Sequence, residues 1–509
     1  MEEGVPSFLS PEMRHTLIFS GKTTMKKTFI FVVVSLLAVA AMAQPARSYK
    51  RGVSENGFTY EAEIHALSPG VSWFYNWANL PNRQVQDVVG PGQEMEFMPM
   101  IWSANFNEAN LRAYLTEHPG VKYLLGYNEP NFRSQANMTP DSAARLWPIV
   151  EKIAADYGMK LVAPALNYSG EALADGKVYQ PEQWMDAFLA AYPEAHFDYL
   201  ALHCYMNDHK AQIAYVENFA KKYGKQVWLT EFCAWEGTVD SAYQQRQMVL
   251  KMRDLELSPY VYRYAWFKAR GSAAAPYYRL IIPPNVRTGE PAPGTLSNTG
   301  ILYTYLSSFD TTYYYPVGTV IPAKDCVNFS DGVEMELNSD TESGQRLQIG
   351  KFDVYAQADY LVEVPADGKY TLQLRLASRK FLFDPKIRVE CDGVAIAEEV
   401  LPATGTVDGV WKTQQLTGLQ LPAGRHRISL KSRQSTTCKI NWLQLVAEQA
   451  VTGDVDGDGK VDVTDVNAVI NIILKTKVQA DYPGLADVDG DDKVDVSDVN
   501  AIINIILKV

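Results

Sequence analysis

Two glutamates stand where a pair of carboxylates could do chemistry. Glu129 lies in LLGYNEPN and Glu231 in VWLTEFCAW, each directly after an apolar run typical of a buried β-strand. Glycosidic cleavage needs such a pair, because one carboxylic acid protonates the leaving oxygen while a second carboxylate meets the developing positive charge. One glutamate at a strand end could equally belong to a structural ion pair. Two at corresponding places favour the catalytic interpretation.

Polar and aromatic residues occupy the other expected strand ends. A sugar ring stacks on aromatic faces, although alternate aromatic side chains of a strand commonly pack in the core. Trp73, Tyr75 and Tyr127 belong to the same aromatic group. The side chains that we expect to contact the substrate are those of Asn128, His203, Tyr205, Trp77, Trp102 and Trp266.

The two glutamates should differ in protonation. We expect Glu231 to be ionised, and Glu129 to have a raised pKa in the free enzyme so that it acts first as acid and then as base. If cleavage retains the anomeric configuration, the two carboxyl groups lie about 5 to 5.5 Å apart, and a separation near about 9 Å would contradict retention. We expect no cofactor for this step.

The elements that would position this pair alternate along residues 50–309. Helical stretches such as 107–117, 140–157 and 241–257 separate short β-type runs, and this alternation predicts parallel strands with helical crossovers. Eight such units match the size of a (β/α)₈ TIM barrel, here expected over residues 50–315, with chemistry at the carboxyl ends of the strands. The expected strands are 50–54, 71–77, 96–101, 122–127, 160–165, 197–202, 226–230 and 261–266.

Residues 50–310 resemble the glycosyl hydrolase catalytic core group typified by glycoside hydrolase family 128. The likeness lies in VSWFYNWAN, EFMPMIW, YLLGYNEPN, DYLALHCY and WLTEFCAW. It implies a retaining enzyme in which Glu129 on strand four is the acid/base and Glu231 on strand seven is the nucleophile. It further implies that Asn128 contacts a sugar 2-hydroxyl, that His203 and Tyr205 orient the nucleophile, and that the substrate is a β-1,3-glucan.

The sequence pattern changes over residues 320–447. Short runs of alternating apolar and polar residues, separated by Gly, Pro and Asp turns, predict an antiparallel β-sandwich (jelly roll). ADYLVEVPADGKYTLQLRLAS and the stretch that begins GVWKTQQL resemble a family 6 carbohydrate-binding module. The resemblance implies a sugar site formed by Trp411 and Asn441, with Tyr355 or Phe352 as the second aromatic residue. Trp411 could instead simply pack. Because Lys324 stands where that family's acidic calcium ligand is usual, we expect no structural ion there.

The tail, residues 452–509, is an internal repeat that begins DVDGDGKVDVTDVN at Asp454 and DVDGDDKVDVSDVN at Asp487. Aspartates at positions 1, 3, 5, 9 and 12 of an EF-hand-like loop can wrap one Ca²⁺, and an apolar helical pattern follows each loop. Gly459 stands at the sharp turn of the first loop, and Asp492 replaces it in the second. A solvated acidic run is the alternative. The expected calcium ligands are Asp454, Asp456, Asp458, Asp462, Asp465, Asp487, Asp489, Asp491, Asp495 and Asp498.

Two such loops with these helices resemble a type I dockerin, a small α-helical module. The resemblance implies a cohesin-type protein partner and a tail that is ordered by Ca²⁺. Twelve Asp against five Lys from Thr452 onward give the tail more than half of the chain's net charge of −12. Clustered Lys and Arg are absent from the sequence, so nucleic acid is not an expected partner.

The N-terminal segment indicates export. Residues 25–43 combine Lys26-Lys27, an apolar run and a small-residue cleavage site at Ala43, which is the layout of a signal peptide, and residues 1–24 read as a start site placed too early. We therefore expect a secreted, extracellular protein, or one attached to the cell surface through its dockerin partner, with no membrane span. Among five cysteines, Cys326 and Cys438 could pair, with buried free thiols as the alternative.

The sequence leaves several interpretations of function open. The leading one is endo-acting, retaining hydrolysis of β-1,3-glucan. The same machinery could act on another β-glucan or on mannan. A non-catalytic polysaccharide-binding protein could also keep such a barrel, although degenerate enzymes often lose one carboxylate of the pair.

Overall fold

The computed structural model describes residues 44–508, except 236, 273–274, 380–382, 435–436, 449–450 and 483. The expected early start (1–24) and signal peptide (25–43) lie outside these residues. No helix in the described part has both the length and the apolar character needed to span a lipid bilayer.

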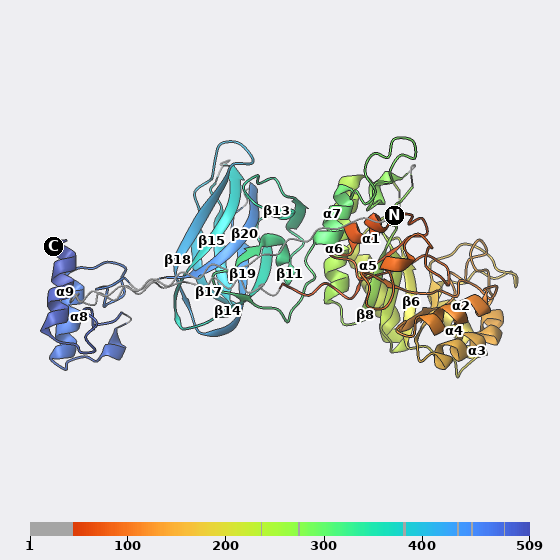
Figure 1. Ribbon diagram of the computed structural model, residues 1–509, viewed down its shortest axis with the longest axis horizontal. Coiled ribbons are helices and arrows are strands. Elements are labelled where there is room, and N and C mark those ends of the chain that lie inside the picture. The colour runs from red at the N-terminus through yellow and green to blue at the C-terminus, as the bar shows by residue number, and fades with distance from the viewer. Residues whose placement is uncertain are drawn as a thin grey trace, which may run out of the picture. The chain divides into compact units, whose positions relative to one another are not determined.

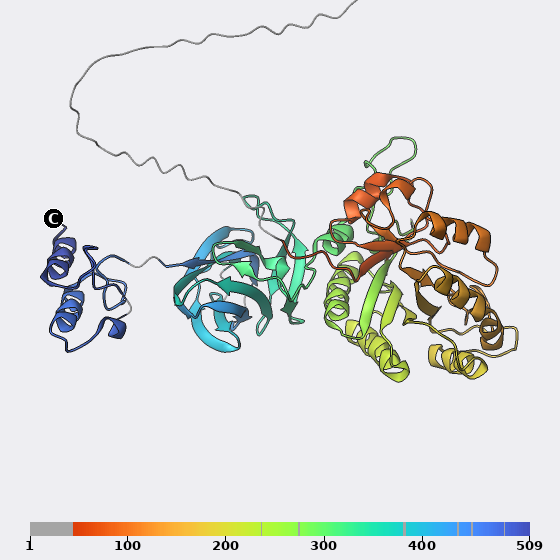
Figure 2. The ribbon, with the colours of Figure 1, turned by 60° about the horizontal axis from the view of Figure 1, so that its bottom comes forward.

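The first part of the chain is built on a curled sheet of eight strands (Figures 1 and 2). Neighbouring strands run parallel in the order β3-β2-β1-β8-β7-β6-β5-β4. The residues after β3 also reach β4, because the Ile101 amide donates to the Leu125 carbonyl at 2.9 Å. The strands are β1 (Arg51–Ser54), β2 (Trp73–Tyr75), β3 (Glu96–Phe97), β4 (Tyr123–Leu125), β5 (Lys160–Leu166), β6 (Tyr199–Cys204), β7 (Val227–Phe232) and β8 (Val261–Phe267).

All eight expected strands are present, with shorter bounds at β2, β3 and β4. Pro99 has no backbone N–H and ends the ladder of β3 early. After β2 the chain turns at Trp77, whose φ is +57°. The prediction of an all-parallel sheet with helical crossovers is therefore confirmed.

Helices cover the outer side of this sheet (Figure 2). Several begin at residues that cap the helix with a side-chain oxygen: Asn107 accepts from the Asn110 amide and Asp208 from the Ala211 amide. Gly224 ends α5 in the left-handed conformation that suits glycine. The helices are α1 (Glu61–Leu67), α2 (Glu108–Glu117), α3 (Pro140–Asp156), α4 (Pro181–Ala191), α5 (His209–Tyr223), α6 (Ser241–Leu257) and α7 (Asn298–Tyr305), with 3₁₀ turns η1 (Gln86–Val88) and η2 (Pro276–Tyr278).

Two further sheets follow, as the alternating pattern predicts. In β15, buried Leu372, Leu374 and Leu376 alternate with half-buried residues, so one face of the strand joins the core. One sheet contains β12 (Val333–Leu337), β13 (Leu347–Phe352), β20 (Thr437–Ala447), β15 (Gly368–Arg379), β18 (Trp411–Leu421) and β10 (Val320–Pro322). The other contains β11 (Asn328–Phe329), β14 (Gln357–Val364), β19 (Gly424–Ser432), β16 (Lys386–Cys391), β17 (Val394–Val400) and β9 (Tyr315–Pro316).

Buried side chains from both sheets belong to the hydrophobic core. The 3₁₀ turn η3 (Ala323–Asp325) follows β10. Cys326 and Cys438 are buried thiols and form no disulfide, so the free-thiol alternative holds for both.

The C-terminal segment contains two helices, α8 (Val463–Ile473) and α9 (Val496–Leu507), with the 3₁₀ turn η4 (Gln479–Asp481) between them. Each helix starts with a capping box, formed by Asp462 with Asp465 and by Asp495 with Asp498. Their small core consists of Val455, Ala468, Val469, Ala486 and Ile502.

Candidate functional site

Both glutamates lie at the carboxyl-terminal side of strands of the parallel sheet. Glu129 follows β4, where its amide donates to the Ala165 carbonyl of β5 at 2.9 Å, and Glu231 lies in β7. Only 7% of Glu129 and 4% of Glu231 is exposed, so both carboxylates face a largely water-excluded site. The φ of Glu129 is +43°, a conformation that costs energy for a residue with a side chain and that clusters at functional sites.

Glu231 is held by three neutral hydrogen-bond donors. The Trp77 indole donates to its Oε1 at 2.7 Å and the Tyr75 hydroxyl to the same atom at 3.0 Å, while the Tyr205 hydroxyl donates to Oε2. Donors of this kind favour the charged form of a carboxylate and fix its orientation. Glu231 is therefore the more rigidly positioned of the two carboxylates.

His203 lies between the two glutamates. It is fully buried, and its Nδ1 is 2.8 Å from Oε1 of Glu129 and 3.4 Å from Oε2 of Glu231. The Asn167 amide donates to the same oxygen of Glu129 at 2.9 Å. Nε2 of His203 is buried and has no hydrogen-bond partner among the described residues.

The pKa values of the two carboxyl groups are shifted opposite to the expectation. Burial acts to raise the pKa of Glu129, but the hydrogen bond and charge of His203, with the Asn167 hydrogen bond, outweigh it and the net shift is downward. Burial raises the pKa of Glu231, and the Glu129 charge adds to this while His203 and the hydrogen bonds from Tyr205 and Trp77 oppose it. The expected order is wrong because His203 contacts Glu129 more closely than Glu231.

The pKa of His203 itself is raised. Burial acts to lower it, but the negative charges of Glu231 and Glu129 and the hydrogen bond to Glu129 prevail. His203 and Glu129 therefore form a hydrogen-bonded couple, whereas Glu231 accepts hydrogen bonds from its own set of neutral donors.

The glutamates line a cavity of about 450 Å³. Of the substrate-binding residues predicted from the sequence, Trp77, Trp102, Asn128 and Tyr205 line it, and His203 lies beneath it. Oδ1 of Asn128 is buried and has no hydrogen-bond partner in the described part of the chain, which suits an atom that receives a sugar hydroxyl.

Trp266 does not reach this cavity. It is fully buried, its indole donates to the Tyr278 carbonyl at 2.7 Å, and its ring packs against Phe232 and Tyr303. Successive side chains of a strand point to opposite faces, and the next residue, Phe267, is the one that lines the cavity. The prediction that Trp266 contacts substrate is wrong by one position in β8.

Five further residues line the cavity and were not predicted from the sequence. Asn167 could have been found as the polar residue just after β5, because the other site residues stand at equivalent places. The sequence groups Tyr75 with the aromatic residues that could stack on a sugar, but its hydroxyl donates a hydrogen bond to Glu231. The missed residues are Asn56, Gln135, Asn167, Phe267 and Lys268.

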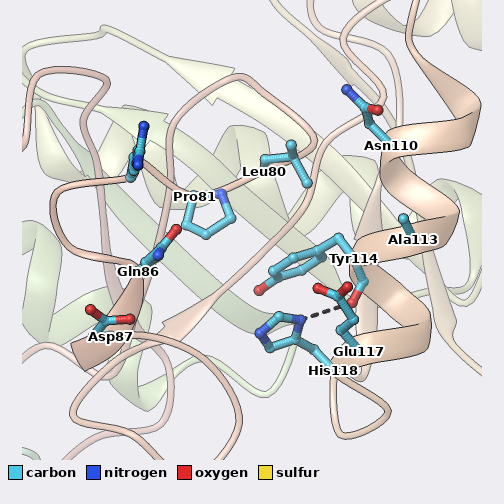
Figure 3. Close-up of a pocket in the computed structure, with 10 residues that line it drawn as sticks. Leu80, Pro81, Gln86, Asp87, Asn110, Ala113, Tyr114, Glu117 and His118 are labelled. Carbon is cyan, nitrogen blue, oxygen red and sulfur yellow. Dashed lines mark hydrogen bonds between the residues drawn. The ribbon is translucent and has the colours of Figure 1, made fainter.

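A larger cavity, of about 580 Å³, lies between the loop after β2 and helix α2 (Figure 3). The Tyr114 ring stacks on His118 with 4.2 Å between ring centroids, so one aromatic face is already covered. Asp87 comes from the loop and Glu117 from α2, and the His118 ring lies between them in Figure 3. Size alone therefore does not identify the site; the paired carboxylates do.

The proposed sugar ligands of the second module are separated in the structure. Asn441 is fully buried, where it donates to Asn338 at 2.6 Å and accepts from Ser343 at 2.6 Å. This is the arrangement of a structural side chain and not of a sugar ligand. Trp411 begins β18, whereas Tyr355 precedes β14 of the other sheet and is 73% exposed.

The alternative second aromatic residue, Phe352, is fully buried. Trp411 is half-buried, and its indole N–H has no hydrogen-bond partner among the described residues. The structure therefore does not assemble the sugar site that the family 6 resemblance implies.

The acidic repeat brings three aspartates together in each loop. Carboxylate oxygens of Asp454, Asp456 and Asp465 lie within 4.8 Å of one another, as do those of Asp487, Asp489 and Asp498. Oδ1 of Asp454 is buried and unpaired within the described residues, which fits a cation ligand. The remaining predicted ligands accept backbone hydrogen bonds instead; they are Asp458, Asp462, Asp491 and Asp495.

The turn residues of the two loops behave as expected. Gly459 has a φ of +88° and Asp492 a φ of +67°, so aspartate adopts the left-handed conformation in place of glycine.

The chain is similar to known glycosidases. The family model described as Glycosyl hydrolase catalytic core matches residues 52–309, and the model described as Dockerin type I domain matches residues 452–507. Among curated proteins, Alkali-sensitive linkage protein 1 of Schizosaccharomyces pombe is 25% identical over 211 residues, which are 40% of this chain and 35% of that protein. The chain thus spans about a third of the length of this relative.

Solved structures of GH128 endo-β-1,3-glucanases are also similar. The enzyme of Pseudomonas viridiflava is 38% identical, with 51% of this chain and 99% of that chain covered and a TM-score of 0.45. The enzyme of Sorangium cellulosum is 30% identical, with 50% and 98% covered and a TM-score of 0.43.

The family model spans both glutamates, their hydrogen-bond partners and all eight strands of the parallel sheet. The chain therefore belongs to the glycosyl hydrolase catalytic core family and carries a type I dockerin domain.

Proposed function

We propose that this glycoside hydrolase is a secreted, retaining endo-β-1,3-glucanase. The observation that carries the proposal is the pair of buried carboxylates, Glu129 and Glu231, with His203 between them at the wall of a 450 Å³ cavity. The eight parallel strands, which we propose to form a (β/α)₈ barrel, present this pair at the edge where such folds place their chemistry.

Glu231 acts as the nucleophile. Its carboxylate attacks the anomeric carbon, and the bond to the leaving oxygen breaks as a covalent glycosyl-enzyme forms. Tyr205, Trp77 and Tyr75 hold the carboxylate in one orientation, so the attacking oxygen needs little reorganisation in the transition state.

Glu129 acts as acid and then as base. The proton of the His203–Glu129 couple moves along their 2.8 Å hydrogen bond to the carboxylate, which delivers it to the leaving oxygen. In the second half of the reaction Glu129 takes a proton from the water that releases the sugar from Glu231. Asn167 keeps the carboxylate facing the cavity throughout.

The spacing of the carboxylates supports retention. One oxygen of each lies within 4.8 Å of the other, whereas an inverting enzyme keeps its carboxyl groups about 6.5 to 9.5 Å apart to admit a water. The substrate assignment rests on the resemblance of five sequence motifs to family 128. The polar side chains of Asn128, Asn56 and Gln135 and the rings of Trp77 and Trp102 supply the mixed surface that a glucan needs.

The appended segments extend this proposal. The two aspartate loops bind Ca²⁺, and the ordered tail docks on a cohesin-type partner. Residues 25–43 direct export, which gives the enzyme access to an extracellular polysaccharide. We also propose a jelly-roll topology and a carbohydrate-binding role for the two-sheet module.

A substrate screen tests the proposal. Purified full-length protein is incubated with laminarin, mixed-linkage glucan, xylan and mannan, and products are sized while proton NMR follows the first anomer released. We expect oligosaccharides from laminarin with β-anomers formed first. Equal activity on mannan would reject the substrate, initial α-anomers would reject retention, and activity on no polysaccharide would favour a binding protein.

A further inference from the structure

Three metal-ligating side chains meet in the two-sheet module, far along the chain from the catalytic pair. Cys391 ends β16, Asp392 occupies the turn to β17, and His426 lies in β19. Cys391 is paired with Ile428 across the two strands. Because His426 stands two residues before Ile428, it shares a face of the sheet with Cys391.

The ligand atoms are already close together. Nδ1 of His426 is 2.7 Å from Oδ2 of Asp392, Sγ of Cys391 is 3.9 Å from that oxygen, and all three atoms lie within 4.8 Å of one another. Metal–ligand bonds of about 2.0 to 2.3 Å in a tetrahedral site put neighbouring ligand atoms about 3.3 to 3.7 Å apart. An ion would therefore need the His426–Asp392 pair to open slightly and the Cys391 sulfur to move closer to it.

The outer hydrogen bonds are those that orient metal ligands. Nε2 of His426 is 3.0 Å from the Pro422 carbonyl, which can only accept, so Nε2 carries a proton and Nδ1 faces the other two ligands. The Arg427 amide donates to Oδ1 of Asp392 at 2.8 Å, which leaves Oδ2 for the cluster. A histidine that donates its second ring N–H to a carbonyl, beside a hydrogen-bonded carboxylate, is typical of metal centres.

We propose that Cys391, Asp392 and His426 bind one transition-metal ion of the zinc class. A thiolate and an imidazole select such ions over Ca²⁺ or Mg²⁺, which prefer oxygen ligands. The cysteine is buried and His426 is nearly so, while Asp392 is exposed, so the fourth coordination position opens to solvent. The ion joins the turn between β16 and β17 to the start of β19. The alternative is a simple His426–Asp392 ion pair beside a core thiol.

Cobalt spectroscopy tests the site in the full-length protein. Co²⁺ is added in the presence of saturating Ca²⁺, which occupies the aspartate loops, and the thiolate-to-cobalt absorption band is followed. We expect one equivalent of Co²⁺ to produce the band and one equivalent of Zn²⁺ to abolish it. The Cys391→Ser and His426→Gln variants should lose at least about tenfold in affinity, the scale on which losing a contact in a metal site is felt.

Cys438→Ser is the matched control, because Cys438 is a buried thiol of the same module, and it should leave the band unchanged. A band that survives Cys391→Ser, or no band in the unaltered protein, would overturn the proposal.

A second measurement needs no variant. X-ray absorption of the Zn²⁺-loaded, Ca²⁺-saturated protein should show one sulfur ligand at about 2.3 Å. A shell of nitrogen and oxygen alone would place the zinc elsewhere and reject the site.

Discussion

At the scale of single residues, the position of His203 determines which of the two glutamates shares a proton with it. Its Nδ1 contacts Glu129 at 2.8 Å and only approaches Glu231, at 3.4 Å. In the proposed mechanism, the His203–Glu129 couple therefore holds the proton needed for leaving-group departure. The same mechanism assigns the attack to Glu231, which accepts hydrogen bonds from three neutral donors.

This division predicts a bell-shaped dependence of kcat/KM on pH. The pKa of Glu231 is raised, so activity is lost as pH falls through that pKa and protonates the nucleophile. The pKa of His203 is raised above its ordinary 6.5, so the couple keeps its proton, and activity persists, until pH rises through that higher value. In His203→Gln the proton rests on Glu129 alone, whose ordinary pKa is 4.5.

We therefore expect His203→Gln to move the alkaline limb to lower pH and to lower kcat about 10²-fold, the low end for a positioned proton transfer. Steady-state rates on laminarin between acid and alkaline pH measure both effects. His209→Gln, in a buried histidine paired with Asp254, serves as the control. An unmoved alkaline limb in His203→Gln would show that His203 does not hold the proton.

Residue positions were predictable where the strand pattern set them. Both glutamates, Asn128, His203 and Tyr205 follow apolar runs, and the fold brings them together. Trp266 was misplaced because an aromatic residue at a strand end can face either side, and only the register of β8 decides. Asn441 was misplaced because the sequence does not reveal whether an amide is satisfied by the protein or open to a ligand.

At the scale of elements, the two acidic loops predict two calcium sites. Carboxylate oxygens of three aspartates in each loop lie within 4.8 Å of one another, so we expect a bound cation to offset their mutual repulsion. Asp465→Asn removes a carboxylate that accepts three backbone hydrogen bonds in its own loop. We expect calorimetric titration of this variant to give one Ca²⁺ per chain in place of two.

Asp481→Asn is the matched control, because Asp481 lies in the same segment but in the 3₁₀ turn between the loops. It should keep both sites. Two tight sites in Asp465→Asn would contradict the assigned ligands.

The elements themselves were largely predictable. Alternation of β-type and helical periodicity located all eight parallel strands, and period-two alternation identified the later sheets. The bounds of β3 depended on Pro99, and those of β2 on the turn at Trp77, which only the three-dimensional arrangement fixes.

At the scale of the whole molecule, calcium and catalysis should be separable. The proposed carboxylate mechanism uses side chains of the parallel sheet, whereas the proposed Ca²⁺ ligands lie in the acidic tail. We expect EDTA to remove a Ca²⁺-dependent thermal transition, because a bound ion stabilises the folded tail. The value of kcat on laminarin should stay within about twofold, because proton transfer between side chains does not need the ion. A loss of hydrolysis that Ca²⁺ restores would show that the tail contributes to the catalytic site.

We propose that Glu129 and Glu231 together break the glycosidic bond. Reducing-sugar release from laminarin by Glu129→Gln and Glu231→Gln, at a protein concentration where Glu194→Gln is fully active, tests it most directly. We expect each of the first two variants to lose about 10³-fold or more in kcat with its thermal stability retained, the range expected when a positioned proton donor or nucleophile is removed. Undiminished hydrolysis by either variant would contradict it.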